Sequence, residues 1–205
     1  MSLLWMLVVP VSSNGQDSEK SLFTFGSPSE HVYVEAIGKY HEGWSGPVDF
    51  ALYRGRVNTS ISRDPLWQAP LRASGWPLLV DSGYMAITIF DDRDEIIVGL
   101  DAEGFEVGEF RPAKSEGEGM YLMCAHCLPM VFASADGHTI YTVINTDYAR
   151  GEALVALDWA LQELWRVTLR ETQSGSVSHE EIDALIAEKS GLDALPTIHP
   201  MPYQE

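Results

Sequence analysis

The clearest pattern of apolar and polar positions lies in residues 128–170, where short apolar runs alternate with turn residues. Asp136-Gly137 stands between two runs that are rich in β-branched and aromatic side chains. Such a pair predicts a β-hairpin, because glycine adopts the positive φ that a tight turn needs without a Cβ clash. Two further strand-like runs follow, at residues 153–157 and 163–169. The stretch therefore predicts four short strands joined by turns.

The same order of apolar run, turn and strand occurs twice more along the chain. FTFGSPSEHVYV begins at Phe23 and parallels VFASADGHTIYTV, which begins at Val131, while WPLLVDSGYMAITIF begins at Trp76. The second halves also agree, because EIIVGLDAEGFEVGEF from Glu95 and EALVALDWALQELWRV from Glu152 both place a valine two positions before Leu-Asp. If one residue is dropped from the shorter copy, the first and last copies share four residue types. The pairs are Phe25 with Phe132, Ser27 with Ser134, His31 with His138, and Tyr33 with Tyr141.

Internal repeats of about 40 to 50 residues, each with about four strands, are typical of β-propeller blades. Residues 98–110 and 155–167 resemble the blade repeat of quinoprotein propellers, the pyrroloquinoline-quinone type. Residues 134–141 are similar to the Ser-Pro-Asp-Gly turn of other propeller families, such as WD-like repeats. Three copies are visible, whereas closed propellers have about four to eight blades. We expect a mainly β fold of three propeller-like antiparallel four-stranded repeats, either a partial or atypical propeller or a β-sandwich, and predict no cofactor.

A different pattern follows the last repeat. Residues 178–181, Ser-His-Glu-Glu, form a capping box, in which the serine and glutamate side chains bind the free N–H groups of a helix start. Ile182, Leu185 and Ile186 then recur at helical spacing, and Gly191 suits a C-terminal stop. The sequence therefore predicts one short helix whose apolar stripe covers an exposed face or edge of a sheet.

These patterns divide the chain into an apolar N-terminal segment and linker (1–21), a repeat-built β domain (22–170), and a C-terminal helix with a proline-containing tail (171–205). The apolar run at residues 3–11 is too short to span a bilayer, which needs about 20 residues. It suits either an ordered strand or the remnant of a secretory signal, although a basic flank is missing. The compartment stays open: cytoplasmic, or exported if residues 1–13 are a signal remnant.

The charge of the chain restricts its partners. Thirteen Lys and Arg residues oppose thirty Asp and Glu residues, so the formal net charge is −17. A surface this acidic repels phosphate backbones and anionic lipid, which argues against nucleic acid and membrane surfaces as partners. A protein, a small molecule or a carbohydrate remains open as the ligand.

Aromatic residues near the predicted turns are the first candidate binding site. We expect the two segments 38–46 and 63–75 to be loops between strands, and binding residues collect in such loops. Tryptophan offers a large rigid ring with one polar group, which can stack on a sugar or an aromatic ligand, but it also packs often in cores. The candidate ligand-binding residues are Tyr40, His41, Trp44, Trp67 and Trp76.

Cys124, His126 and Cys127 are the second candidate site. The two cysteines are the only ones in the chain and form a Cys-x-x-Cys pair. Such a pair can bind a metal, exchange thiols or close a small disulfide. A zinc site usually has four ligands and a second such pair is missing, while a thioredoxin-like site needs a helix after the first cysteine. A structural or incidental pairing is therefore favoured over redox or metal chemistry.

The sequence contains no nucleophile elbow, phosphate loop or zinc-protease helix. We therefore expect a non-catalytic binding or scaffold module of propeller-like type, with enzyme activity left open. The alternatives are a thiol-redox or metal-dependent protein that uses Cys124 and Cys127, and a carbohydrate binder that uses the tryptophan-bearing segments. Because three repeats leave an open sheet edge, a homo-oligomer could cover it.

Overall fold

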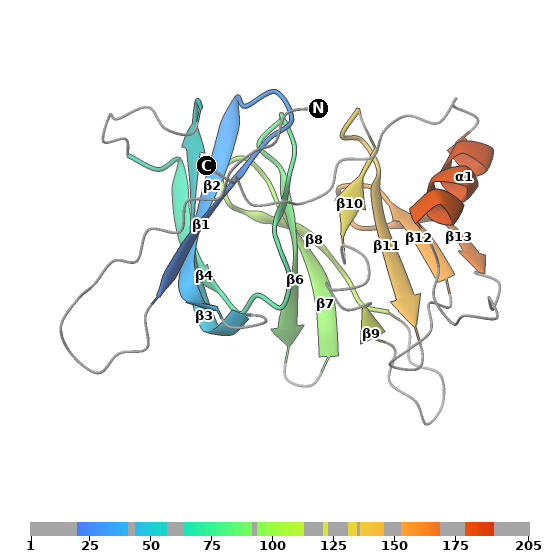
Figure 1. Ribbon diagram of the computed structural model, residues 1–205, viewed down its shortest axis with the longest axis horizontal. Helices are drawn as coiled ribbons and strands as arrows, with labels where there is room; N and C mark the ends of the chain where they lie inside the picture. The colour runs from blue at the N-terminus through green and yellow to red at the C-terminus, as the bar shows by residue number, and fades with distance from the viewer. Residues whose placement is uncertain are drawn as a thin grey trace.

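The computed structural model describes residues 20–40, 44–56, 64–91, 94–112, 121–122, 131–134, 136–145, 153–168 and 179–190. These residues form three antiparallel sheets and one helix (Figure 1). The sheets do not close into a barrel. The predicted mainly β class, with three four-stranded repeats and one short C-terminal helix, is therefore confirmed. The predictions for the N-terminal apolar segment and the proline-containing tail lie outside the described residues.

Each sheet is built from strands that pair with their neighbours along the chain. Sheet 1 contains β1 (Ser21–Gly26), β2 (Val32–Tyr40), β3 (Trp44–Arg54) and β4 (Trp67–Leu71). Sheet 2 contains β5 (Leu78–Leu79), β6 (Met85–Asp91), β7 (Asp94–Leu100) and β8 (Glu106–Phe110). Sheet 3 contains β10 (Phe132–Ala133), β11 (Ile140–Asn145), β12 (Ala153–Leu157) and β13 (Glu163–Thr168), and β9 (Tyr121–Leu122) also pairs with β11.

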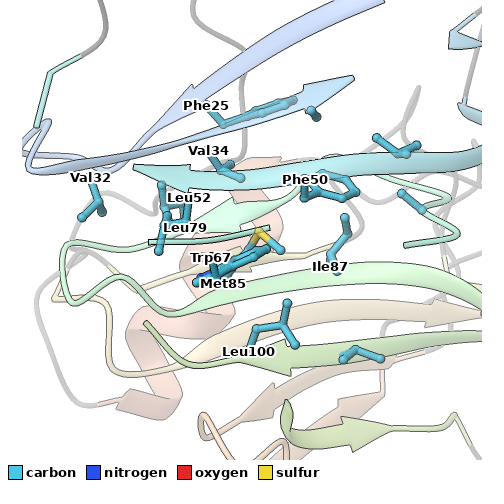
Figure 2. Close-up of a cluster of buried hydrophobic side chains, with 14 of the residues drawn as sticks. Phe25, Val32, Val34, Phe50, Leu52, Trp67, Leu79, Met85, Ile87 and Leu100 are labelled. Carbon is cyan, nitrogen blue, oxygen red and sulfur yellow. The ribbon is translucent and has the colours of Figure 1, made fainter. Parts of the chain in front are cut away.

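The sheets pack face to face in chain order, from left to right in Figure 1. One apolar cluster fills the space between Sheets 1 and 2, with Phe25, Phe50 and Met85 among its buried members (Figure 2). A second cluster lies between Sheets 2 and 3 and includes Ile97 and Ile140. The central strands of Sheet 2, β6 and β7, are therefore covered on both faces, which explains why they read as nearly continuous apolar runs.

Helix α1 (His179–Ser190) covers the other face of Sheet 3, as the sequence predicts. Ile182 and Ile186 are buried against this sheet, and Leu185 packs beside them. The helix begins directly after Ser178, the first residue of the predicted capping box. Within the described part of the chain, no helix is long and apolar enough to cross a membrane.

The repeats share the turn between their first two strands. In each turn a backbone N–H bonds a carbonyl oxygen four or five residues later, which joins Ser27 to Val32, Val80 to Tyr84 and Ser134 to Thr139. The residue that reverses the chain has a positive φ, and these residues are Glu30, Gly83 and Gly137. The internal repeat therefore extends to individual backbone hydrogen bonds.

Sheets 2 and 3 also share the turn between their last two strands. The Asp101 N–H bonds the Phe105 oxygen, and the Asp158 N–H bonds the Gln162 oxygen. The third residue after each aspartate has a positive φ, and each turn follows a register shift in the strand before it. The predicted alignment of the two second halves is therefore confirmed.

One detail of the predicted alignment is wrong. The turns of the first and last copies have equal spacing, so Tyr33 corresponds to Ile140 and not to Tyr141. Because side chains alternate along a strand, a slip of one residue moves a side chain to the opposite face. Tyr33 stacks on Tyr53, its register partner, away from Sheet 2, whereas Tyr141 faces α1.

Glycines provide the close approach between Sheets 2 and 3. Gly99 and Gly108 are register partners on β7 and β8, and the turn at residues 158–161 lies against them. A Cβ at Gly108 would overlap the carbonyl oxygen of Ala160. The Trp159 indole Nε1–H then donates to the Gly137 oxygen at 2.7 Å within Sheet 3. This turn therefore depends on the missing side chains of two paired glycines.

Gly108→Ala should lower the free energy of unfolding by about 1–3 kcal/mol, the usual cost of an overpacked interior. Gly99→Ala is the matched control, because its Cβ would lie 3.2 Å from Val107 Cγ2 and 3.3 Å from the Trp159 oxygen. This milder crowding should cost distinctly less. Urea unfolding followed by circular dichroism measures the stability of both variants. Equal losses of stability would contradict the inference that the 158–161 turn packs more closely on Gly108 than on Gly99.

Candidate ligand-binding site

Four aromatic side chains meet at one end of Sheets 1 and 2. They form the aromatic cluster, which consists of Phe23, Tyr40, Trp44 and Trp76. All six ring pairs are in contact, with centroid separations between 5.0 Å (Tyr40–Trp76) and 5.8 Å (Trp44–Trp76). Most pairs are edge-to-face, and Tyr40 stacks on Trp76 with an interplanar angle of 26°. Both geometries are favourable for aromatic rings.

Strands hold three of the four rings. Phe23 lies on β1, Tyr40 is the last residue of β2, and Trp44 is the first residue of β3. Trp76 comes from the segment that leads into Sheet 2, and its ring also contacts Phe25 in the core at 5.3 Å. All four cluster residues are half-buried. The cluster therefore lies at the boundary of the first apolar layer, with each of its residues only partly buried.

Gly38 explains how Trp44 reaches this position. A Cβ at Gly38 would lie 3.1 Å from Trp44 Cζ3 and 3.0 Å from Val48 Cγ2, so the indole lies directly over the backbone of β2. The register between β2 and β3 shifts at this point. The indole Nε1–H donates to the Gly75 oxygen at 3.2 Å. This bond links Sheet 1 to the segment that carries Trp76.

The structure brings together three of the five predicted binding residues, which are Tyr40, Trp44 and Trp76. His41 lies outside the described residues. Phe23 was missed, although strand alternation places it on the same face as the buried Phe25, and that alternation was the available signal.

Trp67 belongs to a different environment. It begins β4 opposite Leu52, roughly 25 Å along β3 from Trp44 at the usual rise per residue. It is 9% exposed, lies among the residues of the first apolar layer (Figure 2), and its ring packs closely over Gly104. The segment around Trp67, which we expected to be a loop, contains strand β4. Trp67 is therefore a core residue, and its ring packs the Asp101 turn against Sheet 1.

Burial raises the pKa of Tyr40 above its ordinary value. The phenol therefore stays protonated near neutral pH and can both donate and accept a hydrogen bond. The indole N–H of Trp44 is already used by the Gly75 oxygen. A ligand on the cluster would accordingly meet ring faces and one neutral hydroxyl.

Ser29, His31 and Asp81 form a polar group where the β1–β2 turn of Sheet 1 meets the β5–β6 turn of Sheet 2. The Ser29 N–H donates to Asp81 Oδ1 at 2.9 Å, and the Ser29 hydroxyl lies 3.2 Å from His31 Nδ1. Among the described residues Asp81 accepts hydrogen bonds from Ser29 and Ser27, and not from the imidazole. This order differs from a Ser-His-Asp relay, in which the carboxylate orients the histidine. The group therefore connects two turns.

The Cys124, His126 and Cys127 site lies outside the described residues, so its redox and metal chemistry remain predictions. Within the ranges that the structure describes, no group of three or more His, Cys, Asp or Glu side chains could hold a metal ion. Asp91 ends β6 and Asp94 begins β7, and these two residues are register partners.

Asp81 should make the stability depend on pH. Burial raises the pKa of this carboxyl, but hydrogen bonds from Ser29 and Ser27 outweigh burial and lower it below its usual value. A lowered folded-state pKa stabilises the protein above the unfolded value of about 3.9, and this contribution is lost as pH falls through the folded value. Asp81→Asn should therefore destabilise the protein at neutral pH and match the wild type in strong acid.

Urea unfolding of Asp81→Asn and wild type across this acidic range measures the difference. Ser29→Ala is the control, because it keeps the backbone donor to Asp81 and removes only the hydroxyl. It should show a smaller, similarly pH-dependent loss. A stability difference for Asp81→Asn that does not change with pH would show that the carboxylate charge is not responsible.

Neither a known protein-family model nor a curated protein sequence matches the chain. The resemblance of its repeats to quinoprotein-type propeller blades stays a prediction. The functional argument for this chain therefore rests on its own residues and their contacts.

Proposed function

We propose that the protein is a non-catalytic binding module of propeller-like type and that the aromatic cluster is its binding surface. The observation that carries this proposal is the convergence of Phe23, Tyr40, Trp44 and Trp76 in mutual contact, with none of the four residues fully buried. Half-buried tryptophan and tyrosine rings are frequent anchors of binding surfaces, because they offer a large contact area at a low cost in conformational entropy.

The ligand class that fits this surface best is a neutral carbohydrate. The net charge of −17 disfavours anionic ligands. The apolar C–H faces of a sugar ring match the faces of tryptophan and tyrosine, and the Tyr40 hydroxyl can exchange hydrogen bonds with sugar hydroxyls.

The scaffold supports this role. Sites on strands are positioned more accurately than sites on loops. Phe23, Tyr40 and Trp44 lie on three adjacent strands of Sheet 1, and the Trp44 Nε1–Gly75 bond fixes the approach of Trp76. The surface is therefore arranged before a ligand arrives, which reduces the entropy lost on binding.

Affinity electrophoresis with soluble neutral polysaccharides, such as glucans, mannans and xylans, tests the proposal. The wild type should be retarded by at least one of them. Trp44→Leu keeps an apolar side chain but removes the ring, and it should weaken binding about tenfold, the equivalent of one lost stacking contact. Trp44→Phe keeps a ring and loses only the bond to Gly75, so it should retain most of the binding.

Trp159→Phe is the control, because Trp159 lies in the Sheet 3 turn away from the aromatic cluster and should leave retardation unchanged. Thermal unfolding of every variant separates lost binding from lost folding. The proposal fails if no neutral polysaccharide retards the wild type, or if Trp44→Leu remains folded and binds like wild type.

A further inference from the structure

The outer face of Sheet 1 is the third copy of a surface that a neighbouring sheet covers in both other repeats. The shared turn bonds and the strand pairings align its β2 residues with residues of Sheets 2 and 3 that point to the preceding sheet. The aligned sets are Tyr33, Met85 and Ile140; Glu35, Ile87 and Thr142; and Ile37, Ile89 and Ile144. Among the described strands no sheet covers this face of Sheet 1, the first sheet of the series (Figure 1).

The neighbouring strand β3 extends this correspondence. It carries Asp49, Ala51 and Tyr53 on the outer face, where they are register partners of the β2 residues. Their equivalents are buried in the layer with the preceding sheet in both other repeats: Ile96, Val98 and Leu100 in Sheet 2, and Ala153, Val155 and Leu157 in Sheet 3. The outer face of Sheet 1 therefore corresponds, on both central strands, to the surface by which Sheets 2 and 3 receive their neighbour.

This face keeps large apolar side chains in contact with water. Leu22 and Ile37 are register partners on β1 and β2, and they are 48% and 37% exposed. The equivalent of Leu22 in Sheet 2 is Ala73, which pairs with Ile89 and is 2% exposed in the layer with Sheet 1. Adjacent apolar side chains on a protein surface are typical of interaction sites.

Two carboxylates distinguish this face from its apolar equivalents. The Tyr53 hydroxyl donates a hydrogen bond to Glu35, and Asp49 lies 3.7 Å from the Lys20 Nζ in an exposed ion pair. A sheet that buries these carboxylates must supply basic side chains, because a buried charge without a partner is unfavourable. Arginine suits the place, since its guanidinium pairs with a carboxylate and stacks on rings such as the Tyr33–Tyr53 pair, whose centroids are 5.0 Å apart.

We propose that the outer face of Sheet 1 is a docking surface for a partner protein that presents a β-sheet face of apolar and basic side chains. Its apolar side chains pack on Leu22 and Ile37, and its basic side chains pair with Glu35 and Asp49. Continuity with the two layers within the chain supports a sheet as the occupant. The net charge of −17 favours a cationic partner. Because successive side chains alternate, this surface lies on the opposite face of β1 from the Phe23 ring of the aromatic cluster.

A second copy of this chain lacks the required surface. The face of Sheet 3 that would continue the series is covered by α1. The exposed residues of α1 include Asp183 and Glu188 beside Lys189, so they do not offer a cationic surface. Two outer faces of Sheet 1 would bring carboxylates against carboxylates, which is unfavourable. The partner is therefore a different protein.

A synthetic β-hairpin tests the chemistry of this surface. The probe is closed by an Asn-Gly turn and a terminal disulfide, with valines and two arginines on one face. In calorimetric titration the wild type should bind it at least about tenfold more tightly than the same hairpin with glutamates in place of the arginines. E35K/D49K should reverse this preference, and L22S/I37S should weaken both interactions.

E106K/E188K is the matched control, because it changes the net charge equally at exposed positions of β8 and α1. It should keep the preference for the arginine hairpin, and thermal unfolding shows that each variant is folded. A wild type without preference would overturn the proposal, as would a preference that E106K/E188K removes as fully as E35K/D49K.

Photo-cross-linking identifies the natural occupant. The protein is produced in its own cells with p-benzoylphenylalanine in place of Leu22 or Ile37, and mass spectrometry locates the cross-links. They should fall on a strand of another protein where basic and apolar residues occur together, and E35K/D49K should abolish them. Leu164, an exposed residue of β13, is the control position and should not give this product. Cross-links only to a second copy or to residues 1–19 of the same chain, or none that depend on Glu35 and Asp49, would show that the proposal is wrong.

Discussion

The structure depends on one constraint, which is that the middle sheet must bury both of its faces. Met85 and Ile87 point from β6 into the layer with Sheet 1, while Ala86 points from the same strand into the layer with Sheet 3. Both faces carry apolar side chains that are unfavourable in water, so Sheet 2 requires a neighbour on each side. Sheet 2 also covers the inner faces of Sheets 1 and 3. The outer faces of Sheets 1 and 3 have no neighbouring sheet among the described residues, so each must be covered or solvated in another way.

Those solutions differ in kind at the two ends. Sheet 3 keeps an apolar outer surface and relies on α1 to cover it. Sheet 1 instead has Glu35 and Asp49 on its outer surface, where the equivalent positions of Sheets 2 and 3 are apolar or, at Thr142, uncharged. The series of three sheets thus ends under a helix at one side and, at the other, in a face that combines these carboxylates with the exposed apolar residues Leu22 and Ile37. This difference is consistent with three repeats that do not close.

The aromatic cluster is a consequence of the same layering. Where Sheets 1 and 2 end, the apolar layer between them would meet water, and four half-buried rings lie at this boundary. One ring, Trp44, reaches the boundary only because Gly38 has no side chain beneath it. The proposed binding surface therefore consists of residues that packing also requires, since rings that close an apolar layer are rigid aromatic groups at its boundary.

Local sequence by itself determined the hairpins, the shared turns and the helix, because turn residues such as Asp136-Gly137, alternating apolar residues and a capping box act within a few residues. Only the tertiary structure decided which face each strand presents and which tryptophans meet. Trp44, Trp67 and Trp76 look equivalent along the chain, yet Trp67 lies in the core while the other two join Phe23 and Tyr40, because pairing register and sheet packing connect residues far apart in sequence. The Tyr33 alignment failed for the same physical reason: one residue of register, which no local pattern specifies, reverses the direction of a side chain.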